Sequence, residues 1–169
     1  MSQRESYKIP FIGLKNGIHE YEFTVDETFF SQFDESLVNK AKVKFSIQLD
    51  KLTNQINLDL VLYGQVETMC DRCGGELLSE LEGEFMLVVK FGDETSDLID
   101  DIITLGPSEH YIALDQLFYE YVHLCLPQRN VHETEEECNP EAIAALKEYQ
   151  LKEKEEQIDP RWSKLKNLK

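Results

Sequence analysis

Hydrophobic and polar residues alternate along most of the N-terminal half of the chain. The alternation is strictest over residues 42–49 and 56–62, which are separated by the polar segment 51–55. Because successive side chains of a strand point to opposite faces, this period of two predicts an antiparallel hairpin with one buried face. Similar runs over residues 18–25 and 85–91 predict two more strands.

The second strand of the predicted hairpin is expected to be long. Its alternation continues through Val66 and Thr68, and Gly64 suggests a β-bulge on the way. The strand should end at the sequence Cys-Asp-Arg-Cys-Gly-Gly, residues 70–75, because its glycines allow the backbone of a tight turn. Two cysteines would therefore lie at the tip of two strands.

Two further segments have the spacing of helices. Asp26 is a suitable N-cap for a short helix that presents three phenylalanines, at positions 29, 30 and 33, on one face. Apolar residues recur at helical spacing over residues 114–125, and Pro127 ends that pattern. The second segment predicts an amphipathic helix packed on the sheet.

The C-terminal part of the chain is charged and also predicts helix. An asparagine and a proline at positions 139–140 mark a helix start, and oppositely charged residues four apart support a solvated helix over about residues 140–157. Another cap and proline at 159–160 precede a short segment in which Trp162 stands among basic residues such as Arg161 and Lys164. These three residues are candidates for partner binding.

Together these elements predict an α+β fold. We expect an antiparallel, β-rich sheet or a partly closed barrel, with helices packed against it and a charged helix at the C-terminus. The domain organisation would be a β-rich domain over residues 1–138 and a helical charged extension over residues 139–169. A chain of 169 residues is long enough to bury a proper core without disulfides.

Charge changes what the fold can be expected to bind. The formal net charge is −16, and it comes from the middle of the chain: residues 67–141 have 19 acidic and 3 basic side chains, whereas residues 1–66 and 142–169 are close to neutral. Nucleic acids are held mainly by Lys and Arg, so the middle segment disfavours direct phosphate binding and favours a basic partner. Solvated loops that keep the protein soluble are the simpler interpretation of each acidic run.

The N-terminus and the cysteines indicate the compartment. The chain has no run of 18 apolar residues and begins with polar sequence rather than the apolar core of a signal peptide, so we expect a cytoplasmic protein with no membrane partner. In a reducing compartment, four cysteines are expected to be thiols or metal ligands rather than disulfides.

Cys70 and Cys73 have the C-x-x-C spacing of half a zinc knuckle, which needs two more nitrogen or sulfur ligands. Cys125 falls on the apolar face of a predicted helix, where a thiol behaves as a small hydrophobic group. His132 and Cys138 lie in polar sequence and would complete a Cys₃His site. Two alternatives stay open: an exposed histidine with an incidental thiol, and a redox dithiol. Redox motifs usually open a helix, whereas strands flank this one, and the neighbouring Asp71 opposes thiolate formation.

The two motifs, taken in order, resemble the YceD family of large ribosomal RNA subunit accumulation proteins. That family pairs C-x-R-C with a later L-P-x-x-P-x-H/C-x(n)-C, and the resemblance extends over residues 7–138. Asn130 stands where many members have proline, and Cys125 has no counterpart in the pattern. The matching residues of this chain are Cys70, Arg72 and Cys73 in the first motif, and Leu126, Pro127, His132 and Cys138 in the second.

The resemblance implies a cytoplasmic bacterial factor for large-subunit (23S) rRNA, acting in rRNA processing or ribosome assembly. The absence of catalytic motifs and the acidic middle segment favour a non-enzymatic factor whose partners are a basic ribosomal protein or processing factor and pre-rRNA, with Arg72 joining the tail residues in partner binding. The four motif positions Cys70, Cys73, His132 and Cys138 recur as a set in the family, and a zinc ion held by them is our inference. A ribonuclease or rRNA-modifying enzyme is the alternative, followed by a thiol redox protein.

Overall fold

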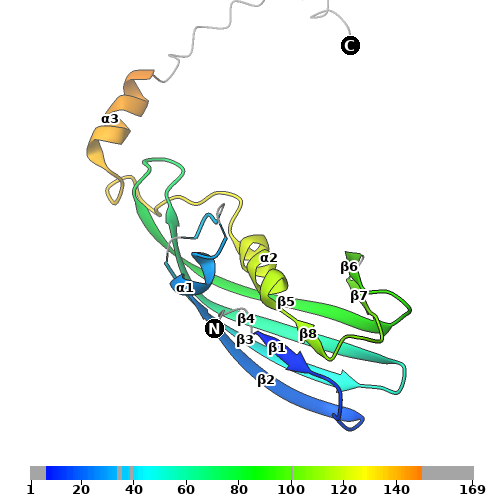
Figure 1. Cartoon of the computed structure of the whole chain (residues 1–169). Helices are drawn as coiled ribbons and strands as arrows, with labels where there is room; N and C mark the ends of the chain where they lie inside the picture. The colour runs from blue at the N-terminus through cyan, green and yellow to red at the C-terminus, as the bar shows by residue number, and fades with distance from the viewer. Residues whose placement is uncertain (1–6, 34–35, 39, 100, 150–169) are drawn as a thin grey trace, which may run out of the picture.

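The computed structural model describes residues 7–33, 36–38, 40–99 and 101–149 of the chain. Strands dominate the first two thirds, and helices follow (Figure 1). In chain order the elements are β1 (Lys8–Pro10), β2 (Gly17–Asp26), α1 (Glu27–Phe30), β3 (Lys40–Lys51), β4 (Gln55–Met69), β5 (Glu76–Phe91), β6 (Ser96–Ile99), β7 (Ile102–Leu105), β8 (Tyr111–Ala113), α2 (Asp115–Cys125) and α3 (Pro140–Tyr149).

Six strands form one open, mixed sheet in the order β2-β3-β4-β5-β7-β6, and β1 pairs with β8 in a separate two-stranded sheet. The α+β class is confirmed, but the partly closed barrel is wrong, because β2 and β6 stand at opposite edges of the described sheet without pairing to each other. A purely antiparallel sheet is also wrong. Strands β5 and β7 pair in parallel, since β7 inserts between β5 and β6.

The predicted strands are present, and the alternation along them produces one buried face. Strand β4 is flanked by β3 and β5 in continuous antiparallel register, so the bulge expected near Gly64 is absent. The glycine has another role: a Cβ at this position would collide with the backbone of Lys42 and Val43 on β3. Gly64 therefore allows strands β3 and β4 to approach closely. Close approach of another backbone is, besides a β-bulge, a common reason for glycine inside a strand.

The short helix α1 begins as the sequence predicts. The Asp26 carboxylate accepts hydrogen bonds from the backbone N–H groups of Thr28 and Phe29, at 3.0 and 3.3 Å, which satisfies two donors that the helix leaves unpaired. Phe29 and Phe30 are buried. The cap thus fixes the direction in which the aromatic pair enters the core.

Helix α2 lies across the buried face of the sheet (Figure 1). Phe118 stacks on Phe45 of β3 with ring centroids 4.0 Å apart, and Tyr121 stacks on Phe85 of β5 at 3.9 Å. The helix ends at Cys125, two residues before Pro127, as predicted. These contacts fix the point at which the following loop leaves the sheet.

Helix α3 begins at Pro140, and the Asn139 side chain accepts a hydrogen bond from the Glu141 N–H at 2.9 Å. The helix projects away from the sheet beyond the β4–β5 turn (Figure 1), and none of its described residues is buried. The rest of the expected helix to residue 157, together with Arg161, Trp162 and Lys164, lies outside the described residues. Among the described helices, none is both long and apolar enough to cross a membrane.

Candidate metal centre

The first half of the site is the turn between β4 and β5, residues 70–75. The Cys70 N–H donates to the Gly75 carbonyl and the Gly74 N–H donates to the Cys70 carbonyl, both at 2.8 Å. Gly74 has a φ of 68°, a left-handed conformation that glycine adopts without steric cost. The turn brings Cys70 and Cys73 to one side of the hairpin tip, as the sequence predicts.

The second half of the site is the loop that follows α2, and the residues between the two cysteines hold it. The Asp71 N–H donates to the Asn130 carbonyl, and the Asn130 N–H donates back to the Asp71 carboxylate, both at 2.7 Å. The Arg72 guanidinium donates to the carbonyls of His132 and Thr134, at 2.5 and 3.3 Å. These hydrogen bonds hold the loop against the turn, and none of them involves a sulfur atom.

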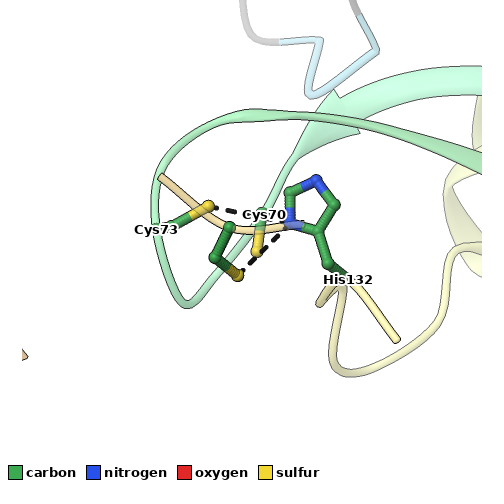
Figure 2. Close-up of side chains that lie close together, drawn as sticks. Cys70, Cys73 and His132 are labelled. Carbon is green, nitrogen blue, oxygen red and sulfur yellow. Dashed lines mark hydrogen bonds between the residues drawn. The ribbon is translucent and has the colours of Figure 1, made fainter. Parts of the chain in front are cut away.

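The two halves bring four potential ligands together. Cys70, Cys73, His132 and Cys138 each offer one atom, and these four atoms all lie within 4.8 Å of one another. The Nδ1 atom of His132 lies 3.7 Å from the sulfur of Cys73 and 3.5 Å from that of Cys138 (Figure 2). Cys70 and Cys138 are 2% and 3% exposed, whereas Cys73 and His132 are half-buried, so two of the four candidate ligands are closed to solvent and two are partly accessible.

A hydrogen bond to the backbone orients His132. Its Nε2 atom lies 3.0 Å from the Glu76 carbonyl, which can only accept, so the Nε2 atom carries a proton in this bond. In the neutral ring, Nδ1 then keeps its lone pair and faces the sulfur atoms. Metal-bound histidines usually have an outer hydrogen bond of this kind, which sets the tautomer and the ring orientation.

The thiols differ in how readily they ionise. Burial raises the pKa of Cys70, but backbone hydrogen bonds, that from His132 first, outweigh burial and lower it to about 6. The pKa of Cys73 is also lowered, chiefly by a backbone hydrogen bond from Asn139. The pKa of Cys138 is raised, chiefly by burial. The first motif therefore favours thiolates, the form that binds metals.

This donor set fits a metal ion. Three cysteine sulfurs and one histidine nitrogen, converging from a turn and a loop, are the ligands of closed tetrahedral sites. The fourth cysteine, Cys125, lies elsewhere, half-buried against the hydrophobic core, as its place on the helix predicts. The position of Asp71 predicts a raised pKa for Cys70, but that pKa is lowered, because the backbone N–H donors around Cys70 favour its thiolate.

Sequence reasoning missed how the loop is held. The Nη2 atom of Arg72 donates to carbonyls of the loop, a role not predicted from the sequence, while the contact of Arg72 with a partner stays a prediction. The pairing of Asp71 with Asn130 was not anticipated either, because it joins residues far apart in the chain. The sequence contains one indication that Asp71 and Arg72 hold the loop, which is their position inside the C-x-x-C motif.

Fold and site together define a small protein with a β-rich sheet, in which a cysteine–histidine cluster joins a hairpin tip to a distant loop. The chain belongs to the YceD family: the model of that family, described as large ribosomal RNA subunit accumulation protein YceD, matches residues 58–169. No curated protein and no solved structure gives a match to the chain.

The matched range differs from the one expected from the two motifs. It begins inside β4, so β2 and β3 fall outside it, and it runs to the last residue rather than stopping at Cys138. All four residues of the cluster lie within it. The family name connects the chain with the accumulation of large-subunit ribosomal RNA.

Proposed function

We propose that this protein is a non-enzymatic factor that supports the accumulation of large-subunit (23S) rRNA, during either rRNA processing or assembly of the subunit. The observation that carries this proposal is the match to the YceD family over residues 58–169. That range contains both halves of the cysteine–histidine cluster, so the site and the family assignment concern the same part of the molecule. The cytoplasmic location expected from the sequence belongs to the same proposal.

The proposed partner is a basic ribosomal protein or a processing factor, with pre-rRNA as a further ligand. Support comes from charge: residues 67–141 have 19 acidic side chains against 3 basic ones. A surface of this kind attracts basic proteins and repels phosphate groups. The basic tail with Arg161, Trp162 and Lys164 would be the part that contacts rRNA or protein.

We propose further that the cluster binds a zinc ion with a structural role. The ion would be held by Cys70, Cys73, His132 and Cys138, and it would join the hairpin tip to the loop. Elemental analysis of protein purified without chelator should find about one zinc per chain, as in four-ligand structural sites. Less than about a tenth of an equivalent would count strongly against a resident metal ion.

Co-sedimentation tests the proposed function. The full chain, added to lysate fractions that contain large-subunit precursors, should sediment with the precursors at low salt and less at high salt, because charge contributes to the association. Mature large subunits serve as the control. Absence from precursor fractions at every salt concentration would contradict the proposal.

The redox alternative has the lowered pKa values of Cys70 and Cys73 in its favour. Cys70 is only 2% exposed, whereas a reactive cysteine needs access to its substrate, and Cys73 is half-buried. Rapid alkylation of Cys70 near neutral pH, in metal-free and metal-loaded protein alike, would favour the redox function over the structural site.

An rRNA-cleaving enzyme would need a clustered acid and base, such as His132 with neighbouring carboxylates. Both ring nitrogens of His132 already face groups of the chain, Nε2 the Glu76 carbonyl and Nδ1 the sulfur atoms. Cleavage of precursor transcripts by the pure protein, abolished in His132→Ala, would establish the enzyme instead.

A further inference from the structure

Among the described residues, no helix or strand packs on one face of the main sheet. Helix α2 and the β1–β8 pair cover the opposite face (Figure 1). The uncovered side, here called the outer face, consists of the even-numbered residues of β2, β3 and β5 and the odd-numbered residues of β4. All of these residues are exposed or half-buried.

The outer face exposes more large apolar side chains than is usual for a sheet face in contact with water. Antiparallel sheets usually present polar residues to water, and clusters of exposed apolar groups mark interaction sites. The exposed apolar side chains of this face are Ile18 (63%), Val61 (47%), Tyr63 (61%), Met69 (64%), Leu78 (64%) and Met86 (74%).

Three of these side chains are neighbours at the centre of the sheet. Val61 and Tyr63 are two residues apart on β4, so they point to the same side. Val61 pairs with Glu84 and Asp59 pairs with Met86, which puts Met86 diagonally beside Val61. Diagonal neighbours lie about 7 Å apart, within reach of long side chains.

Carboxylates surround this apolar centre. The strand register defines two neighbouring rows across the sheet, Glu22-Ser46-Val61-Glu84 and Glu20-Gln48-Asp59-Met86. Neither row contains a basic residue, and part of them lines a shallow hollow of about 570 Å³. Lys44, in the next row, pairs with Glu22 at 2.7 Å. Over the whole outer face, ten acidic residues stand against four lysines.

The charge decides between possible occupants. A second copy of the chain would bring an acidic face against an acidic face, and like charges across an interface are costly. Nucleic acids and anionic membranes are repelled for the same reason. A polypeptide with lysine or arginine beside apolar side chains complements both features of the face. An extended segment that lies along these strands, which are about 4.8 Å apart, can contact the apolar centre and the carboxylates around it at the same time.

We propose that the outer face of the β2–β5 sheet binds an extended cationic polypeptide segment, through Val61, Tyr63 and Met86 at the centre and through Glu20, Asp59 and Glu84 around them. The inference rests on the proposed function, because it assigns the docking surface for its basic partner. It places that surface on the sheet rather than around the cysteine–histidine cluster.

Fluorescence anisotropy with a labelled peptide tests this surface. The probe is a peptide of about twelve residues, long enough to span a strand, with leucine at every fourth position and lysine elsewhere, so that in an extended chain the leucines share one face with lysines between them. The sheet variant combines Glu20→Gln, Asp59→Asn and Glu84→Gln. Its matched control removes three charges elsewhere, with Glu133→Gln, Glu136→Gln and Glu137→Gln.

The sheet variant should bind the peptide about tenfold more weakly than the unaltered chain, and the control variant within about twofold. Val61→Ser with Met86→Ser should weaken the leucine-containing peptide and leave an all-lysine peptide of the same length unaffected. Equal losses in both charge variants, no binding at low salt, tighter binding of a labelled RNA of similar length, or self-association that the sheet variant abolishes would overturn the proposal.

Co-sedimentation separates this inference from the proposed function. If the unaltered chain fails to sediment with large-subunit precursors, the proposed function is wrong, whatever the peptide result. If the unaltered chain and the sheet variant sediment equally well, the function stands and the assignment of the outer face is wrong. A loss confined to the sheet variant supports both.

Discussion

At the scale of single residues, Asp71 and Arg72 explain why the site forms where it does. A C-x-x-C turn provides only two sulfurs, and the other two ligands come from a loop about sixty residues later in the chain. Hydrogen bonds from Asp71 and Arg72 hold that loop at the positions of Asn130 and His132. The site is thus positioned by the residues between the cysteines as well as by the ligands themselves.

Replacement of Arg72 should weaken metal binding without removing a ligand. In Arg72→Gln the carbonyls of His132 and Thr134 lose their shared donor, and loss of such an outer contact typically lowers metal affinity about tenfold or more. Competition with a chromogenic zinc chelator measures the effect. Arg129→Gln, an exposed arginine of the same loop, is the control and should keep the original affinity. Equal affinities in all three proteins would contradict a positioning role for Arg72.

Tyr121 offers a prediction for stability and its pH dependence. Its hydroxyl is buried, and no hydrogen-bond partner lies within reach among the described residues. Burial, together with the carboxylates of Asp101 and Glu120, raises its pKa to about 12. Tyr121→Phe keeps the stacking on Phe85 and removes the unpaired hydroxyl, so the free energy of unfolding should rise by about 1 kcal/mol at neutral pH.

The difference in stability between Tyr121→Phe and the unaltered chain should grow as the pH rises. Because the pKa of Tyr121 is higher in the folded chain than in the unfolded chain, its ionisation costs the fold no stability below pH 10 and an increasing amount as the pH rises towards 12. Urea unfolding of both proteins should therefore show the advantage of Tyr121→Phe growing above pH 10. A gap that stays constant or narrows would show that the hydroxyl ionises as readily in the folded chain as in the unfolded chain, which contradicts its burial.

At the scale of elements, the contact between α2 and β5 depends on a glycine. A Cβ at Gly83 would overlap the sulfur of Cys125, and it would lie 3.1 Å from the ring of Phe85. The helix can approach the strand this closely only because position 83 has no side chain. Cys125 therefore has a packing role, and burial raises the pKa of its thiol.

A pair of substitutions tests this packing. Gly83→Ala should lower the free energy of unfolding by about 1 to 3 kcal/mol through overpacking. Cys125→Ala, which removes the overlapping sulfur, should restore part of that loss, so the two effects should not be additive. Gly64→Ala is the control, because its Cβ meets backbone atoms of β3 and no loss of the Cys125 sulfur can relieve it. If the effects of Gly83→Ala and Cys125→Ala on the free energy of unfolding are additive, the side chains at positions 83 and 125 are not in contact.

The elements also show where sequence patterns stop being informative. The long strands and helix α2 are predicted because their periodicity extends over many residues, whereas the four-residue helix α1 is predicted from its Asp26 cap and the spacing of its phenylalanines. Strands β6 and β7 have four residues each, too few for a period to be recognised, and they lie in or beside the acidic run of residues 93–101, whose composition predicts a solvated loop. Their order in the sheet, with β7 parallel to β5, depends on contacts that no local pattern encodes.

At the scale of the whole molecule, the core and the cysteine–histidine cluster are separate. The cluster of buried hydrophobic residues extends over strands β2 to β5 and over α1 and α2, and it includes none of the four candidate ligands. The sheet therefore does not depend on a metal ion for its core. A metal ion would instead hold together the hairpin tip and the loop at one end of the molecule.

Metal removal should loosen that end alone. After chelation, backbone amides of residues 70–75 and 130–138 should exchange hydrogen faster and together, because bound metal contributes on the order of 10 kcal/mol in structural sites. Amides in the centre of β3 and β4 should stay protected, and the far-UV circular dichroism of the sheet should persist. Cys125→Ser, which leaves all four candidate ligands in place, is the control. Global unfolding on chelation would show that core and site are coupled.

The sequence alone determined the features that depend on local order. These are the alternation that makes one face of the sheet apolar, the caps and proline that bound the helices, and the two motifs that name four candidate ligands. Each is a relation between residues close in the chain, where backbone geometry fixes which side chains share a face.

The tertiary structure decided everything that joins distant segments. It left the sheet open, inserted a parallel strand, turned Arg72 inward to hold the loop, and gathered the carboxylates of four strands around an exposed apolar centre. The physical reason is that strand register and loop docking depend on packing between residues tens of positions apart. Such contacts leave no periodic trace in the sequence, and they become visible only when the chain is folded.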